Sequence, residues 1–163
     1  GAYAKTIGLT DEQVILKSKH SDLRSFLANN QAERQAIAES KFEIDTELVR
    51  GKSMIVVDDS VIRGTVSRAL IEQLRLAGAL EVHVRVPAPI YKYSCYYGMD
   101  TGRAEELLAT GRTLEEMRDY IGADSLEFLS PAGVLQAAQR PVGKMCLACA
   151  TGDYPTTISI TKR

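Results

Sequence analysis

Residues 54–68, MIVVDDSVIRGTVSR, decide the fold because they place a strand, a turn and a helix in immediate succession. Met54–Val57 is an unbroken apolar run that ends at an Asp-Asp pair. Continuous apolarity without alternation is typical of a parallel strand that is covered on both faces. Apolar side chains recur at helical spacing over residues 65–77, and Gly78 is placed to end that helix. The stretch therefore predicts the first half of a parallel βαβ unit.

The elements expected on either side of this stretch complete an α/β fold. Glu81–Val86 is a second strand after the helix. The order of strands and helices predicts a mainly parallel sheet flanked by helices, with a helical C-terminal segment, in one domain over residues 1–163. The other expected elements are a buried strand at 14–16, an exposed helix at 31–39, a helix opened by the capping-box pair Thr113 and Glu116 and ended by Gly122, a strand at 125–129, and a helix with Ser130 as N-cap and Pro131 in its first turn.

Composition excludes several classes of protein. The chain has 163 residues, of which 45% are hydrophobic and 25% charged, close to average globular usage, so neither a disordered chain nor a membrane protein is expected. The net charge is −1 and no run of basic residues occurs, which argues against nucleic-acid binding. Three cysteines form an odd set, and the first residues lack the apolar core of a signal peptide, so we expect a reducing, cytoplasmic location.

The residues after the strand have the chemistry of a sugar-phosphate site. In parallel sheets, ligands bind beyond the carboxyl ends of the strands. A glycine, hydroxyl side chains and the free N–H groups of a helix N-terminus favour a phosphate there. Two adjacent carboxylates repel a phosphate, but they suit sugar hydroxyls or Mg²⁺. The candidate binding residues are Asp58, Asp59, Ser60, Arg63, Gly64, Thr65 and Ser67.

A simpler interpretation of the same turn is an Asx turn followed by an N-cap, with no ligand. Neither the nucleoside-triphosphate P-loop pattern nor the GxGxxG dinucleotide pattern occurs in the chain, so those two readings drop out.

The cysteines form a second candidate site. Cys146 and Cys149 have the CxxC spacing of metal and iron–sulfur ligands, and Cys95 lies about fifty residues upstream. Cysteines packed as small apolar side chains are the alternative, and three thiols are one short of a four-cysteine site. A thioredoxin-like redox pair is disfavoured because no strand is expected directly before the motif.

Several separate stretches resemble one family. MIVVDDSVIRGTVSR resembles the phosphoribosyl pyrophosphate (PRPP) motif of type I phosphoribosyltransferases, in the version found in the glutamine PRPP amidotransferase family. The likeness extends over about residues 1–155, through EVHVRVPAPIYKYSCYYGMD, RAEELLATGRTLEEMRDYIGADSLEFLS and CLACATGDYP. It implies a type I phosphoribosyltransferase-like sheet that lacks its first strand or strands.

The resemblance also implies roles for named residues. Asp58 and Asp59 would serve the ribose hydroxyls and Mg²⁺ of PRPP, and the turn from Ser60 to Ser67 would hold the 5-phosphate. The stretch KSKHSDLRSFLANNQAERQ resembles the family's catalytic loop, in which Lys17 and Arg24 would stabilise the leaving pyrophosphate. One departure is Val66, where a threonine is usual.

One branch of the family carries a structural [4Fe–4S] cluster. Cys95, Cys146 and Cys149 match three of its ligands, and the fourth would lie outside this chain. The family's glutaminase domain, with its N-terminal cysteine nucleophile, is not in the sequence. The expected partners are PRPP and nucleotides, the missing glutaminase domain and further copies of the chain, without nucleic acid or membrane.

Two functions from different classes follow from this interpretation. The first is the phosphoribosyltransferase part of an enzyme that transfers the phosphoribosyl group of PRPP to ammonia, giving 5-phosphoribosylamine in purine synthesis. The second is a PRPP- or nucleotide-sensing module that keeps the phosphate turn but has no catalysis. A regulator of this kind is expected to carry a nucleic-acid-binding surface, which the net charge of −1 disfavours.

Overall fold

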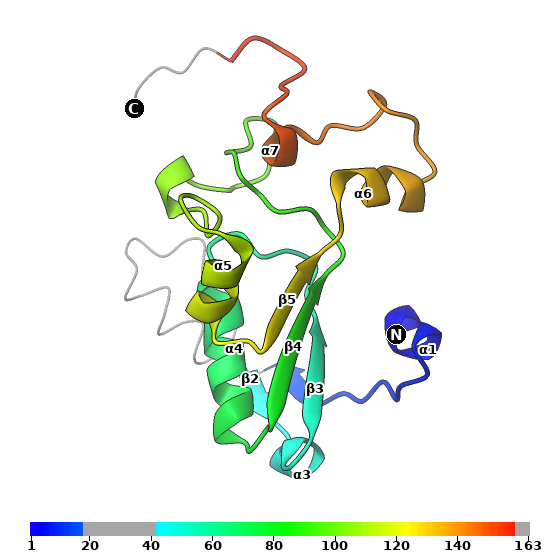
Figure 1. The fold of residues 1–163 in the computed structure, drawn as a ribbon, viewed down its shortest axis with the longest axis vertical. Coiled ribbons are helices and arrows are strands. Elements are labelled where there is room, and N and C mark those ends of the chain that lie inside the picture. The colour runs from blue at the N-terminus through cyan, green and yellow to red at the C-terminus, as the bar shows by residue number, and fades with distance from the viewer. Residues whose placement is uncertain (18–41, 159–163) are drawn as a thin grey trace.

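A computed structural model of the chain describes residues 1–17 and 42–158 (Figure 1). The elements in those residues are α1 (Ala2–Thr6), β1 (Ile15–Lys17), β2 (Phe42–Ile44), α3 (Thr46–Val49), β3 (Ser53–Val57), α4 (Thr65–Leu76), β4 (Glu81–Val86), the 3₁₀ turn η2 (Ala104–Glu106), α5 (Leu114–Ile121), β5 (Ser125–Phe128), α6 (Pro131–Ala137) and α7 (Ala148–Thr151).

The main sheet is parallel, as the sequence predicts. Its strands lie in the order β3, β4, β5, with Val56 opposite Val84 and Val84 opposite Leu126. Helix α4 links β3 to β4, and α5 leads into β5; both helices lie along the same side of the sheet (Figure 1). The expected α/β order is therefore confirmed from β3 to α6.

The hydrophobic core lies between this side of the sheet and the two helices. Val82 and Val84 of β4 and Leu126 of β5 point into it and are almost fully buried. Leu74 of α4 and Ile121 of α5 meet them from the helix layer. Burying a side chain of this size contributes about 1.5–3 kcal/mol, so this layer holds β3 and α4 together.

The sequence predicts that β3 is covered on both faces, and this prediction is wrong. Burial alternates along β3, and Ile55 and Val57 keep 36% and 50% of their surface exposed. The same face continues into polar side chains of β4 and β5. His83 Nδ1 lies 2.9 Å from Ser125 Oγ, and Arg85 donates to the same hydroxyl at 2.8 Å. A parallel pairing does not by itself place helices on both faces.

The predicted helix ends are confirmed in detail. The Thr113 hydroxyl accepts the Glu116 N–H at 3.2 Å, while the Glu116 carboxylate accepts the Thr113 N–H at 2.7 Å. Gly122 ends α5 in the left-handed conformation, with φ of 77°. Ser130 caps α6 by accepting the Gly133 N–H at 3.0 Å. Each of these hydrogen bonds joins residues three positions apart, which is why the sequence predicts them.

The strand expected near the N-terminus lies outside the main sheet. β1 covers residues 15–17 and pairs antiparallel with β2 in a separate two-stranded sheet. Val14, just before β1, is buried as predicted. The helix expected at 31–39 falls outside the described residues.

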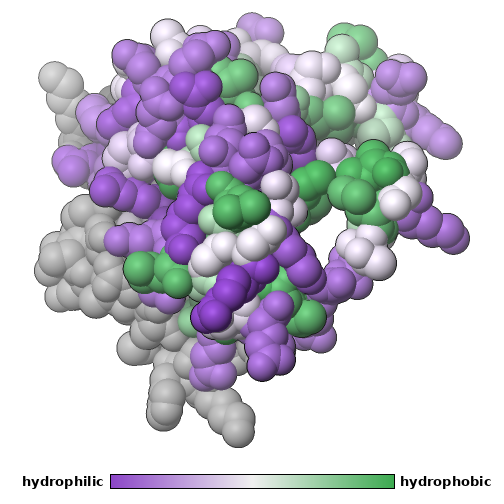
Figure 2. Space-filling model, turned by 60° about the horizontal axis from the view of Figure 1, so that its bottom comes forward, coloured by the Kyte–Doolittle hydropathy of each residue, from purple (hydrophilic) through white to green (hydrophobic). Residues whose placement is uncertain are grey.

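The surface mixes charged and apolar residues. Figure 2 shows hydrophobic residues as separate patches between hydrophilic ones on the face that it presents. Across residues 1–17 and 42–158, every helix is too short or too polar to cross a membrane.

Candidate functional site

The turn between β3 and α4 forms the candidate site. The Asp58 N–H donates to the Arg85 carbonyl at 3.2 Å, which fixes the start of the turn to the end of β4. Gly64 is the N-cap of α4 and has no side chain to cap the helix. The first N–H groups of α4 therefore point out of a helix whose dipole favours an anion at this end. Thr65 and Ser67, in the first turn of α4, are both buried.

Gly64 is required by both conformation and space. Its φ is +75°, in the left-handed region that favours glycine. A Cβ at this position would lie 3.1 Å from Leu108 Cδ2 and 3.2 Å from both Ile121 Cγ2 and Tyr120 Cε1. The turn thus rests directly on buried side chains of the core and α5, with no room for any other residue without displacement.

The two adjacent carboxylates lie in different surroundings. Asp58 is half-buried, and burial together with the charge of Asp59 raises the pKa of its carboxyl above the usual aspartate value. The Ser67 hydroxyl donates to its carboxylate at a long 3.5 Å, and the Asp59 backbone also hydrogen-bonds to it. Asp59 is exposed, and the Ser60 hydroxyl donates to it at 3.0 Å. Asp59 is thus the more accessible carboxylate for a cation or a sugar hydroxyl.

The segment around η2 holds the turn from the other side. Arg63 Nε lies 2.9 Å from the Glu106 carboxylate, and the two side chains keep only 17% and 24% of their surface exposed. The backbone is joined as well, since the Leu108 N–H donates to the Ile62 carbonyl at 2.8 Å. These contacts join residues more than forty positions apart, and no local pattern in the sequence predicts them.

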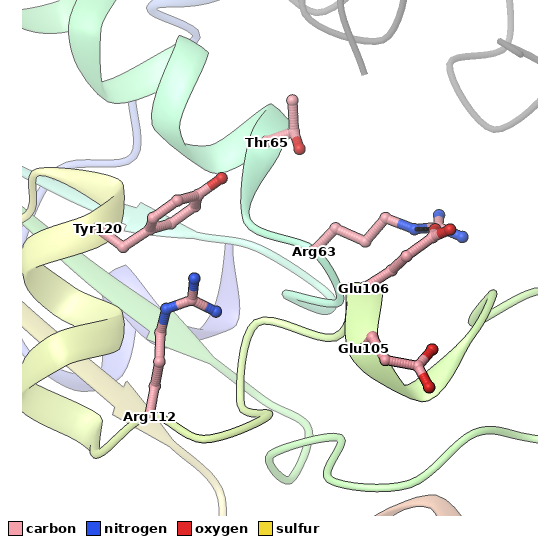
Figure 3. A pocket seen from close by; sticks show the side chains of 6 residues that line it. All are labelled: Arg63, Thr65, Glu105, Glu106, Arg112 and Tyr120. Atoms are coloured by element: carbon pink, nitrogen blue, oxygen red, sulfur yellow. Dashed lines mark hydrogen bonds and ion pairs between the residues drawn. The ribbon is translucent and has the colours of Figure 1, made fainter. Parts of the chain in front are cut away.

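A pocket of about 180 Å³ lies between the turn and this segment (Figure 3). Arg63 and Thr65 contribute to it from the turn, and the other lining residues are Glu105, Glu106, Arg112 and Tyr120. The other predicted binding residues are not part of its lining. Asp58, Asp59, Ser60, Gly64 and Ser67 belong to the same turn outside this pocket.

Two arginine side chains lie over the ring of Tyr120 on α5. The guanidinium carbons of Arg68 and Arg112 lie 5.5 and 5.0 Å from the centre of its ring. Arg112 also donates to the Leu108 carbonyl at 3.1 Å. Arg68, Arg112 and Tyr120 are not among the binding residues predicted from the sequence. The positive charge of the two arginines next to the N-terminus of α4 adds to the attraction for an anion.

Cys149 lies in α7, Cys146 lies just before it, and backbone hydrogen bonds join α7 to the segment before Cys95. The Cys149 carbonyl accepts the N–H groups of Lys92 and Tyr93 at 2.8 and 3.0 Å, which binds α7 to the segment before Cys95. Burial, followed by the charges of Cys95 and Cys146, raises the pKa of the Cys149 thiol. The Tyr97 N–H donates to Cys95 Sγ at 3.4 Å. An irregular segment, not a strand, precedes α7.

This arrangement does not yet amount to a metal centre. Among residues 1–17 and 42–158, no three His, Cys, Asp or Glu side chains are grouped so as to hold a metal ion. The close convergence of all three sulfurs, and the cluster itself, stay predictions. Of the two catalytic candidates, Lys17 is the last residue of β1, and Arg24 lies outside the described residues.

Comparisons with known proteins support one family. The amidophosphoribosyltransferase of Bacillus subtilis is 41% identical in an alignment of length 160, which covers 96% of this chain and 33% of that protein. The amidophosphoribosyltransferase of Archaeoglobus fulgidus is 39% identical, over 96% of this chain and 34% of its own length. A scan against protein-family models finds no match.

Solved structures agree with these relatives. Glutamine PRPP amidotransferase from B. subtilis, complexed with ADP and GMP, matches with a TM-score of 0.81 and 40% identity. The match covers 98% of this chain and 36% of that one. A structure described as the allosteric regulatory enzyme of purine biosynthesis gives a TM-score of 0.80, also at 40% identity. By sequence and by fold, the chain is thus a homologue of the amidophosphoribosyltransferases, spans about a third of their length, and has a type I phosphoribosyltransferase-like fold.

Proposed function

We propose that the chain binds PRPP at the turn between β3 and α4 and serves the transfer of its phosphoribosyl group to ammonia, giving 5-phosphoribosylamine. The observation that carries this proposal is the N-terminus of α4, where Gly64 as N-cap supplies no capping side chain, next to an exposed and a half-buried carboxylate. The homologous amidophosphoribosyltransferases support the reaction class.

Each group of the turn has a part in this proposal. The N–H groups that follow Gly64 donate to the 5-phosphate of the sugar, and the α4 dipole favours its charge. Asp59 and Asp58 accept hydrogen bonds from the ribose hydroxyls. Ammonia attacks the anomeric carbon and forms the C–N bond, while the bond from that carbon to the pyrophosphate oxygen breaks and pyrophosphate leaves with the electron pair. The new ammonium group then loses a proton to solvent to give the amine. Lys17 and Arg24 are proposed to offset the charge that develops on the pyrophosphate.

Asp59 and Asp58 are also the proposed ligands for Mg²⁺. Carboxylate oxygen is the donor that Mg²⁺ prefers in proteins, and the exposed Asp59 is accessible to an ion that arrives with its substrate. When bound, the ion would neutralise charge on the pyrophosphate. The raised pKa of Asp58 disfavours its ionised form, so we assign the larger share of the metal contact to Asp59.

Cys95, Cys146 and Cys149 are proposed to hold a [4Fe–4S] cluster together with a cysteine outside this chain. The charges of Cys95 and Cys146 both act on the Cys149 thiol, which supports placing the three cysteines in one site. The Tyr97 N–H that donates to Cys95 Sγ is the kind of hydrogen bond that stabilises a thiolate. The cluster would have a structural role, because phosphoribosyl transfer needs no redox step.

Purine nucleotides are the second class of proposed ligand. A nucleoside 5′-monophosphate presents the same ribose 5-phosphate group that the turn is proposed to bind. The related B. subtilis enzyme was solved with ADP and GMP, which supports nucleotide binding in this family.

Calorimetry with ribose 5-phosphate and PRPP, with and without Mg²⁺, tests the proposal. We expect binding by the folded chain and about a tenfold weaker affinity for PRPP with Mg²⁺ in Asp59→Asn, since hydrogen bonds to charged groups are worth about 1.5–3 kcal/mol. Asp153→Asn makes the same change at an exposed residue after α7 and is expected to leave affinity unchanged. Absence of binding by the folded chain at millimolar ligand would overturn the proposal.

A further inference from the structure

The Arg63 side chain is held away from its own turn by Glu106. Arg63 Nε donates to one oxygen of the Glu106 carboxylate at 2.9 Å, and Arg103 Nε lies 3.4 Å from the other oxygen. Arg103 is 82% exposed, whereas Arg63 and Glu106 are mostly buried. The inner ion pair is therefore the stronger of the two, because buried charges are screened less by water and salt. Figure 3 shows the Arg63 guanidinium lying alongside the Glu106 carboxylate.

The backbone around Gly102 is shaped to receive this ion pair. Gly102 has a φ of +70°, and a Cβ built on it would overlap Arg63 Nη2 and lie 3.0 Å from Glu106 Oε2. The Asp100 carboxylate accepts the Gly102 N–H at 3.2 Å, and Ser94 donates to the Gly102 carbonyl at 3.1 Å. The guanidinium thus lies against bare backbone that is itself fixed on both sides.

Residues 106–108 contact three consecutive residues of the turn. The Leu108 N–H donates to the Ile62 carbonyl, Glu106 pairs with Arg63, and Leu108 Cδ2 would lie only 3.1 Å from a Cβ on Gly64. Leu108 is itself almost fully buried. The conformation of the turn just before α4 therefore depends on the position of residues 106–108.

A carboxylate near an anion site has an electrostatic cost, since like charges repel. Glu106 lines the same pocket as Arg63 and Thr65, close to the N-terminus of α4. Because Glu106 is mostly buried next to a proposed phosphate site, some favourable interaction must offset this repulsion. The ion pair with Arg63 is such an interaction, because it fixes the turn in the arrangement that presents the N–H groups of α4.

We propose that Glu106 is a positioning residue: acting through Arg63, it holds the phosphate turn ready for ribose phosphate. The proposal rests on the function proposed above for that turn. Removing a negative charge near an anion site would ordinarily strengthen anion binding, and the proposal predicts the opposite for Glu106. Deleting the Glu106 carboxylate weakens the binding of an anion, although the protein becomes less negative at the site.

Calorimetry with ribose 5-phosphate measures this sign. We expect Glu106→Ala to weaken binding about tenfold, the scale of one charge-assisted hydrogen bond. Glu106→Gln keeps the shape and a neutral hydrogen bond, so a smaller loss is expected. The matched control is Glu105→Ala, which removes the same charge from the neighbouring, exposed residue of the same pocket. It is expected to leave the affinity unchanged or to raise it.

A double-mutant cycle tests whether Glu106 acts through Arg63. In an Arg63→Ala background, Glu106→Ala should cause little further loss. An equal tenfold loss in both backgrounds would overturn the proposal, as would equal effects of the Glu105 and Glu106 substitutions.

Hydrogen exchange supplies a readout that needs no ligand. The Leu108 N–H, which is bonded to the turn, should exchange about tenfold faster in Glu106→Ala, while amides of β4 stay unchanged. Unchanged exchange at Leu108 would overturn the positioning role even if ribose 5-phosphate binds. A further outcome is that the wild type binds no ribose 5-phosphate while exchange at Leu108 is still faster in Glu106→Ala. In that case the proposed function of the turn is wrong, but the positioning of the turn by Glu106 is supported.

Discussion

Gly64→Ala is the sharpest test of how the turn is built. The left-handed conformation costs an alanine about 1–2 kcal/mol. The new methyl group would also lie 3.1–3.2 Å from Leu108, Tyr120 and Ile121, which are part of the core or packed against it. Overpacking of this kind costs about 1–3 kcal/mol. The smaller entropy of the unfolded alanine chain returns about 0.4–1 kcal/mol. The net expectation is a loss of about 3 kcal/mol in the free energy of unfolding.

Gly51→Ala is the matched control. Gly51 has almost the same φ, +74°, but nothing lies within 4 Å of the position that its Cβ would occupy. Only the conformational and entropic contributions remain, so a loss of about 1 kcal/mol is expected.

Urea unfolding of the two variants and the wild type, followed by circular dichroism, gives the comparison. Calorimetry should also show weaker ribose 5-phosphate binding in Gly64→Ala alone. Equal stability losses in the two variants would refute the inference that the turn is packed against the core without spare room.

Two further predictions concern titratable groups. Burial raises the pKa of Asp58 in the folded protein, so its ionisation weakens folding progressively as the pH rises above the ordinary aspartate pKa, and fully above the raised value. Asp58→Asn should therefore raise the urea midpoint at pH 7, and the gain should vanish as the pH falls toward the ordinary aspartate pKa; a lower midpoint at pH 7 would contradict this. For the cysteines, Cys149→Ser should abolish the broad visible absorbance of a cluster in anaerobically purified protein that includes the fourth ligand, whereas Thr151→Ser, in the same helix, should keep it. Unchanged absorbance in Cys149→Ser would exclude this cysteine as a ligand.

The parts of the fold that the sequence predicts are those set by neighbours along the chain. The capping box of α5 joins residues 113 and 116, and the Ser130 cap joins residues 130 and 133. β3, α4 and β4 are likewise defined by apolar spacing within fewer than fifteen residues each. Local hydrogen bonds and a local pattern of burial are enough to fix these elements.

The exposure of β3 depends on residues far along the chain. An apolar run indicates that a strand can be buried, but it does not say how many elements pack on it. Met54 and Val56 lie against the core, whereas Ile55 and Val57 stand on the face opposite α4 and α5. The sequence prediction was wrong because it inferred from the apolar composition of the strand that other elements cover both of its faces.

The candidate site divides in the same way. The motif gives Asp58, Asp59 and the glycine turn, because all of them lie within ten residues. It cannot give Glu106, which reaches Arg63 from forty-three positions away. The structure shows why such a partner is needed. Arg63 keeps only 17% of its side-chain surface exposed, and an unpaired buried charge is strongly destabilising. That burial is not visible in the motif, and the chain's path from β4 to α5 is what brings Glu106 to Arg63 and leaves its neighbour Glu105 exposed.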